Sequence, residues 1–212
     1  MAEFILFSYL CGMNENNHWS ENIIIADADY IDKVAFELSV NFERMIGRRI
    51  PKADLARWLD CIALDGGLRE GENEVQEGLI HDKGDKAFEN FAPSDYAGEL
   101  NGKAFKDHLG EFIITTLEVE DIVTRTQFIN DIVGAACVQE NVKRIMIVPD
   151  GEDGVTYDQL RGALSHVSDD TKRITMFAMQ PMTGGNFRQE ILGYSLLNAL
   201  GIKPEEIDNK TK

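Results

Sequence analysis

The run Asn22–Ala26 (NIIIA) constrains the fold most, because four consecutive apolar residues leave no polar face for solvent. A strand of this kind is buried on both faces, as in the middle of a parallel sheet. The run Lys143–Pro149 (KRIMIVP) has the same character. Both strands therefore require helices above and below the sheet to which they belong.

Strand-like and helix-like segments alternate along most of the chain. Strands are predicted at residues 3–10, 22–26, 75–81, 111–119, 143–149 and 172–179, and helices from Asp29 to Ile46, from Pro51 to Ile62, and at 124–139, 156–167 and 187–200. Such alternation implies right-handed crossovers and a parallel sheet covered on both faces. Residues 82–110 give mixed signals, and their course is not predicted.

We therefore predict an α/β fold with three layers over a single domain, residues 1–212. A mainly parallel central sheet of Rossmann-like type carries helices on both faces. The aromatic and β-branched segment 3–10 is expected to form an antiparallel strand at one edge.

Acidic residues follow both of the buried strands. They are Asp27, Asp29 and Asp32 after the first strand, and Asp150, Glu152 and Asp153 after the second. Ligands of open α/β sheets bind outside the carboxyl ends of the strands. If the two strands are neighbours, these carboxylates converge and need a hard cation such as Mg²⁺ or Mn²⁺ to offset their repulsion.

Ordinary structural roles explain the same acids without any ligand. Asp27 or Asp29 is suited to cap the helix that follows, and Asp150 is suited to open a turn ahead of Gly151. Both interpretations remain open from sequence alone.

A third junction, Pro181–Glu190 (PMTGGNFRQE), precedes the last predicted helix. Its two glycines would let a phosphate approach the helix N-terminus, with Arg188 assisting. Alternatively the glycines turn the chain and Asn186 caps the helix. The segment lacks the lysine of a P-loop and the spacing of a dinucleotide-binding loop.

Composition narrows the function classes. The net charge of −16, from 37 acidic and 21 basic residues, repels phosphate backbones and anionic membranes, which disfavours a nucleic-acid partner. The histidines, serines and cysteines show neither zinc-ligand spacing nor a nucleophile-elbow pattern. No apolar run approaches the roughly 20 residues that span a bilayer, so we expect a cytoplasmic protein without membrane contact.

The motifs IIIADAD and IMIVPDGED, each a strand followed by acids, resemble those of the PIN/NYN nuclease family. The resemblance covers roughly residues 22–180. It implies that Asp27, Asp150 and Asp153 are the acids at the strand ends, and that Asp121 or Asp131 is the acid on an intervening helix. The chain is also similar to bacterial proteins classed as domains of unknown function, which implies a fold and no activity.

Two functions remain open. As an enzyme, the chain would hydrolyse phosphodiesters, with Asp27, Asp150 and Asp153 binding Mg²⁺ or Mn²⁺ and Asp29 orienting the attacking water. Alternatively it is a non-catalytic interaction or self-assembly module, forming homo-oligomers through apolar edges at residues 4–10 and 88–105.

Overall fold

A seven-stranded sheet forms the centre of the computed structural model, which describes residues 19–167 and 172–208. The strand order is β5-β6-β3-β1-β7-β8-β9. The strands are β1 (Asn22–Asp27), β3 (Asn73–His81), β5 (Lys103–Lys106), β6 (Gly110–Glu118), β7 (Arg144–Val148), β8 (Arg173–Ala178) and β9 (Arg188–Ile191). All adjacent pairs are parallel except β5 with β6.

The structure confirms the predicted α/β fold, with a mainly parallel sheet and helices on both of its faces. The antiparallel edge strand of the described chain is β5. The N-terminal strand predicted at residues 3–10 lies outside the described residues.

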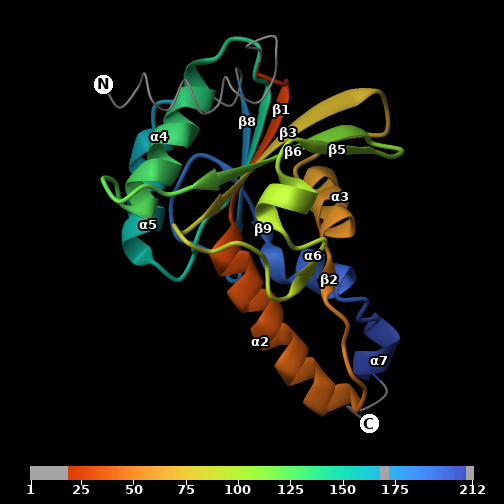
Figure 1. Ribbon diagram of the computed structural model, residues 1–212. Helices are drawn as coiled ribbons and strands as arrows, with labels where there is room; N and C mark the ends of the chain where they lie inside the picture. Colours follow the sequence, from red (N-terminus) through yellow and green to blue (C-terminus); the bar gives the residue numbers. More distant parts are fainter. Residues whose placement is uncertain (1–18, 168–171, 209–212) are drawn as a thin grey trace.

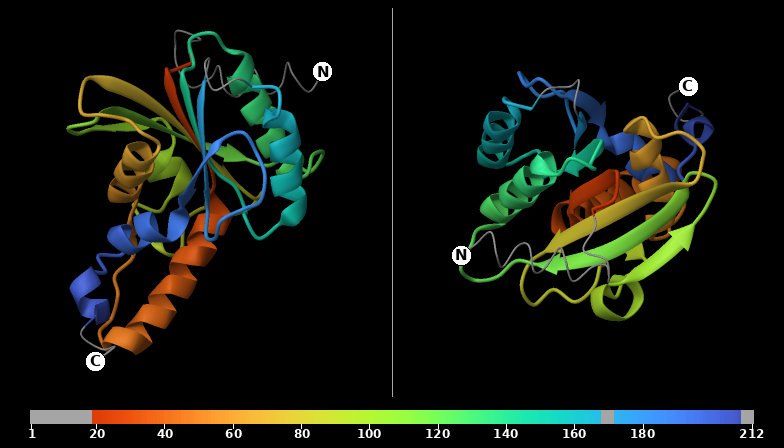
Figure 2. Two further views of the ribbon diagram at one scale, coloured as in Figure 1. Left: turned by 180° about the vertical axis from the view of Figure 1, so that it is seen from behind. Right: turned by 90° about the horizontal axis from the view of Figure 1, so that it is seen from above.

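Helices cover both faces of the sheet (Figures 1 and 2), and an apolar layer holds them against each face. On one face, α2 (Ala28–Ile46), α3 (Leu55–Asp65) and α6 (Leu192–Ala199) pack against alternate strand residues such as Ile24 and Met146. On the other face, α4 (Arg125–Val138) and α5 (Gly154–Leu164) pack against the intervening residues, such as Ile25 and Ile147. Among the described helices, none is both long and apolar enough to cross a membrane.

The direction of chain growth reverses beside β1. From β1 the chain builds outward through β3 to β6, and α4 then leads it back to β7 on the other side of β1. The C-terminal ends of β1 and β7 therefore border the crevice in which open α/β sheets bind ligands. Both acidic motifs of the sequence begin at this crevice.

Most helices begin and end close to the residues at which the sequence predicts their ends. Gly47 ends α2 with a φ of 72°, a conformation that glycine adopts without strain. The helix predicted to begin at Pro51 begins only at Leu55, where Asp54 caps α3. The two residues before α3 instead form the short strand β2 (Ala53–Asp54), which pairs with β4 (Phe91–Ala92). Segment 82–110 also contains one π-helical turn, η1 (Tyr96–Leu100).

The helix predicted at 187–200 is in fact two elements. Its first residues form β9, which pairs in parallel with β8, and only Leu192–Ala199 is helical. Asn186 therefore does not cap a helix, and its side chain donates a hydrogen bond to the Val167 carbonyl. The last described element is α7 (Pro204–Asp208). Its Glu206 Oε1 lies 2.7 Å from Nε of Arg48, just after the end of α2, so the two helices are joined by this ion pair.

A carboxyl group lies in the middle of the larger core. Glu77 is fully buried in β3 between Ile24 of β1 and Ile114 of β6, and neither of its carboxyl oxygens has a hydrogen-bond partner among the described residues. Burial raises the pKa of Glu77 well above its ordinary value. The folded protein therefore favours the neutral acid.

Replacing Glu77 with Gln is expected to stabilise the protein at alkaline pH and to change little near pH 5. Because the pKa of Glu77 is higher in the folded than in the unfolded protein, the wild type loses stability as pH rises above the pKa of Glu77 in the unfolded chain. Gln has no proton to lose, so the variant does not show this loss. We expect a gain of about 1–3 kcal/mol in the free energy of unfolding at pH 9, measured by urea denaturation. An equal difference at both pH values would show that ionisation of Glu77 is not the cause.

Candidate functional site

Asp27 is the central residue of the crevice. It ends β1 and caps α2, with its Oδ1 accepting a hydrogen bond from the Tyr30 amide at 3.0 Å. The side chain is 1% exposed, and its Oδ2 has no hydrogen-bond partner among the described residues. Of the two capping candidates, Asp27 and not Asp29 is therefore the cap, and one carboxylate oxygen remains for another partner.

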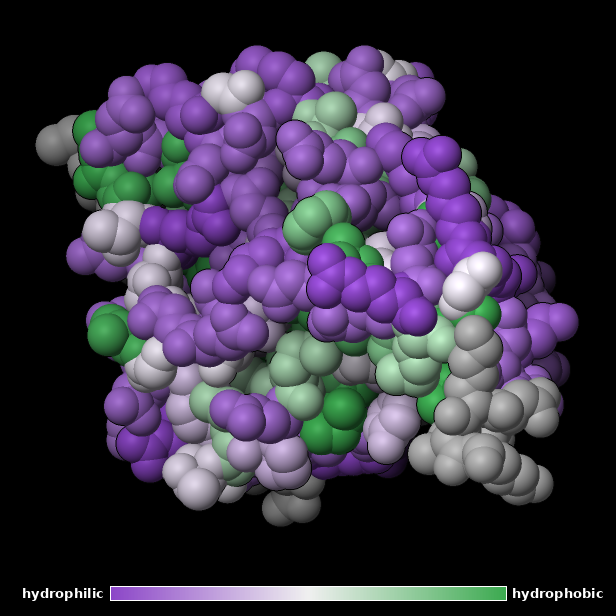
Figure 3. Space-filling view, turned by 90° about the horizontal axis from the view of Figure 1, so that it is seen from below, coloured by the Kyte–Doolittle hydropathy of each residue, from purple (hydrophilic) through white to green (hydrophobic). Residues whose placement is uncertain are grey.

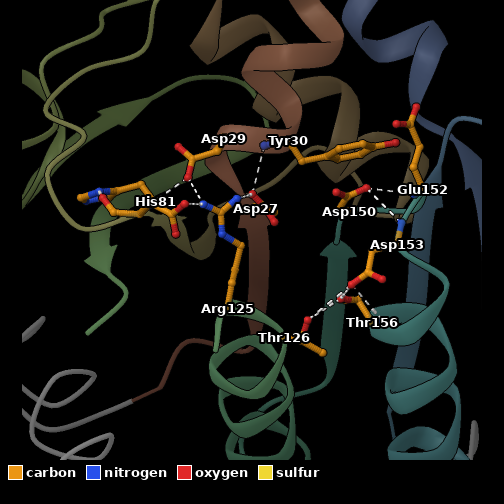
Figure 4. A network of polar contacts seen from close by, with 11 residues as sticks. Asp27, Asp29, Tyr30, His81, Arg125, Thr126, Asp150, Glu152, Asp153 and Thr156 are labelled. Atoms are coloured by element: carbon orange, nitrogen blue, oxygen red, sulfur yellow. Dashed lines mark hydrogen bonds and ion pairs between the residues drawn. The ribbon is translucent and has the colours of Figure 1, made fainter. Parts of the chain in front are cut away.

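Arg125 supplies the positive charge of the crevice (Figure 4). As the first residue of α4, it reaches Asp27 Oδ1 at 3.0 Å, Asp82 Oδ2 at 2.5 Å and also Asp29 Oδ2. Burial lowers the pKa of Arg125, but the bond to Asp82 and the charges of Asp27 and Asp29 outweigh it and raise the pKa. One guanidinium thus neutralises part of a three-carboxylate cluster.

Desolvation dominates the ionisation of Asp27. Burial raises the pKa of Asp27 from 3.8 to about 6, although Arg125 and the Tyr30 amide oppose it. The negative charges of Asp29 and Asp150 raise it further. An ionised Asp27 at neutral pH therefore destabilises the fold, because the carboxylate is buried. Carboxyl groups with pKa values raised in this way are common at functional sites.

The second acidic motif lies across the crevice, after β7. Asp150 opens a turn, and its Oδ1 accepts hydrogen bonds from the amides of Glu152 and Asp153 at 2.9 and 3.3 Å. In Figure 4 the Asp150 carboxylate stands at the end of β7, on the side of the crevice opposite Arg125. Its effect on the Asp27 pKa shows that the two groups interact electrostatically.

Asp153 is held by local bonds. It caps α5, with Oδ1 accepting from the Val155 amide at 3.1 Å and Oδ2 accepting from the Thr156 hydroxyl at 2.5 Å. These bonds, that of the Thr156 hydroxyl above all, lower the pKa of Asp153. Both carboxylate oxygens of Asp153 thus accept hydrogen bonds at the start of α5. The metal-binding role of Asp153 stays a prediction.

A cavity of about 470 Å³ opens beside the crevice, between α2, the segment after β3, and α4. Carboxylate oxygens of Asp29, Asp82 and Asp85 lie there within 4.8 Å of one another. Five carboxylates and two cationic side chains line the cavity: Asp29, Asp32, Asp82, Asp85 and Glu89, with Lys33 and Arg125. Its surface charge therefore selects for cations.

Sequence reasoning missed three residues of this site, Asp82, Asp85 and Arg125. The sequence signal for the first two was the segment DKGD directly after the β3 residues, again at a strand end. Nothing local marks Arg125, whose partners lie 43 to 98 residues away. Asp121 and Asp131 are both exposed. Only Asp131 lies on α4, whereas Asp121 lies in the turn before that helix and pairs with Lys83.

Most of the expected apolar edge at 88–105 is buried. Its side chains Phe88, Phe91, Tyr96 and Leu100 are at most 3% exposed, because they pack into the core beside α3. Phe105, on the edge strand β5, is half-buried. The face in Figure 3 is mainly hydrophilic, with small apolar patches between the polar side chains. The other proposed edge, residues 4–10, lies outside the described residues.

No curated protein and no solved structure matches the chain significantly. A family model described as a family of unknown function (DUF6621) matches residues 16–207, which is most of the chain. The chain therefore belongs to this family of unknown function.

Proposed function

We propose that the protein is a metal-dependent phosphodiester hydrolase of the cytoplasm, similar to PIN/NYN nucleases, with Mg²⁺ or Mn²⁺ in the crevice between β1 and β7. The observation that carries the proposal is the buried Oδ2 of Asp27, which has no hydrogen-bond partner among the described residues. A buried carboxylate oxygen of this kind needs a partner, and a hard divalent cation is one that oxygen ligands suit.

The donor atoms around the crevice fit such a cation. Asp150 uses only Oδ1 in the hydrogen bonds of its turn, and in Figure 4 its other carboxylate oxygen lies on the side toward Asp27. Asp153 anchors the Asp150 loop to α5 and keeps that carboxylate in place. When bound, the cation would neutralise phosphate charge and activate water as a nucleophile.

The chain's own residues supply the other roles. Arg125 remains bound to Asp27 Oδ1 and leaves the opposite oxygen available. Asp29 uses only Oδ2 in its contacts with Arg125 and the Asp82 amide, so its Oδ1 is available to orient the attacking water. The acidic surroundings exclude an anionic substrate until a cation is present, which makes hydrolysis strictly dependent on metal.

Calorimetric titration with Mn²⁺ tests the proposal. Asp27→Asn and Asp150→Asn are each expected to weaken Mn²⁺ binding at least about tenfold, because each removes a ligand charge. Asp54→Asn is the matched control, because Asp54 caps α3 as Asp27 caps α2 but lies on a different element. Its Mn²⁺ affinity should equal that of the wild type.

Two outcomes would contradict the proposal. The first is the absence of Mn²⁺ or Mg²⁺ binding at millimolar concentration. The second is a loss of affinity in Asp85→Asn but not in Asp150→Asn, which would place the cation in the adjacent cavity. Hydrolysis of bis-p-nitrophenyl phosphate, with and without EDTA, then tests the reaction, and a single-stranded oligonucleotide tests the substrate class that the net charge disfavours.

A further inference from the structure

Three strands begin with arginines, at the N-terminal ends of the strands and so at the end of the sheet opposite the acidic crevice. They are Arg144 of β7, Arg173 of β8 and Arg188 of β9. Arg144 and Arg173 are register partners in parallel strands, so their side chains share a face of the sheet. Arg188 pairs with Thr175, two residues beyond Arg173, and therefore lies on the same face.

The loop after α3 brings two of these guanidinium groups together. Arg144 Nη1 donates a hydrogen bond to the Gly66 carbonyl at 3.1 Å. A Cβ on Gly67 would lie 3.5 Å from Arg144 Nη1 and 3.4 Å from Arg188 Nη1. Gly67 has a φ of 87°, which disfavours a side chain there. The backbone of this loop therefore lies beside both guanidinium groups.

Among the described residues, ion pairs neutralise only part of the positive charge of this cluster. Arg188 pairs with Glu190 at 3.1 Å, whereas Arg144, Arg173 and the neighbouring Arg69 have no ion-pair partner among the described residues. This is unusual in a chain with 37 acidic and 21 basic residues. Burial and then the charges of the other three arginines lower the pKa of Arg144, which shows that the cations repel one another.

Two polar atoms on this face also have no partner among the described residues. One is Arg144 Nε, which is buried. The other is the hydroxyl of Thr175, a residue that is 0% exposed and is the register partner of Arg188. Buried donors without partners are rare in folded proteins. That of Arg144, beside arginines without ion pairs among the described residues, indicates that this guanidinium cluster is arranged for an external acceptor.

We propose that Arg144, Arg173 and Arg188, with Arg69, form a binding site for the phosphate group of a small molecule. The planar guanidinium fork matches a phosphate with paired hydrogen bonds, and a doubly charged anion removes the repulsion among the arginines. This site is independent of the metal site, because it lies at the N-terminal ends of the strands and is positively charged, whereas the metal site lies at the C-terminal ends and is negatively charged.

Titration with inorganic phosphate against sodium chloride of equal ionic strength tests this site. The wild type is expected to bind phosphate with millimolar or tighter affinity. Arg173→Gln changes an exposed side chain that has no ion pair within the described part of the chain, so it should fold normally and weaken phosphate binding about three- to tenfold. The double variant Arg144→Gln/Arg173→Gln should lose binding at least about tenfold.

Arg49→Gln is the matched control, because it removes one exposed arginine near the end of α2. It should bind phosphate as the wild type does. Binding no stronger for phosphate than for chloride, or equal phosphate affinity in wild type and Arg173→Gln, would overturn the proposal. Asp150→Asn should leave phosphate binding intact, so failure of the metal site and failure of this site are distinguishable.

Discussion

Replacing Arg125 with Met is expected to lower the free energy of unfolding by about 3 kcal/mol at pH 7.5 with EDTA present. The substitution leaves Asp27, which is 1% exposed, without the one cation that pairs with it among the described residues, and it also removes the partner of Asp29 and Asp82. At pH 5 the loss should shrink, because Asp27 is then protonated. Urea denaturation at the two pH values measures both effects.

Arg161→Met is the control for this experiment. Arg161 pairs with Asp158 at 2.9 Å on the exposed surface of α5, and breaking such a pair costs at most about 1 kcal/mol. Equal losses in the two variants would show that the three carboxylates do not depend on Arg125. If the crevice binds Mn²⁺ as proposed, adding Mn²⁺ should restore part of the stability of Arg125→Met and none of that of Arg161→Met.

Replacing Asp27 with Asn is expected to stabilise the protein by about 1–3 kcal/mol at pH 7.5 in EDTA. The folded pKa of Asp27, about 6, exceeds the ordinary 3.8, so the wild type loses stability as pH rises from about 4 through 6. Asn keeps the cap on α2 because its oxygen accepts the same amide bond. Thermal unfolding from pH 3 to 8 measures the effect.

The gain should vanish below pH 4, where Asp27 is protonated in both folded and unfolded chains. A destabilised variant at pH 7.5 would instead show that the bond from Arg125 outweighs the cost of burial. A stabilised variant that loses Mn²⁺ binding would fit a carboxylate retained for function at the expense of stability.

The sequence was sufficient for much of the fold because the informative segments are local. The apolar runs at 22–26 and 143–149 specified strands buried on both faces, and β1 and β7 are neighbours in the sheet. Their acids therefore follow neighbouring strands at the same end of the sheet, as strand polarity requires. The helix predicted at 187–200 failed at its start because pairing with β8 overrides the local preference of residues 188–191.

The composition of the site was less accessible to sequence reasoning. Arg125 joins Asp27, Asp29 and Asp82 only after three separate elements have packed, and no local pattern encodes that meeting. The capping roles of Asp27 and Asp153 were among the alternatives that the sequence left open. Segment 82–110 was unreadable because its short elements β4, η1 and β5 depend on packing against the sheet.

The parallel strands also give the protein an electric dipole moment. Carboxylates follow the C-terminal ends of β1, β3 and β7, whereas arginines begin β7, β8 and β9, and the five residues of β7 span about 16 Å between its two ends. At distances beyond the Debye length of about 8 Å, an anionic surface experiences only weak net repulsion from the molecule. At closer range the dipole turns the molecule, so that the start of β7, and not its end, meets the anion first.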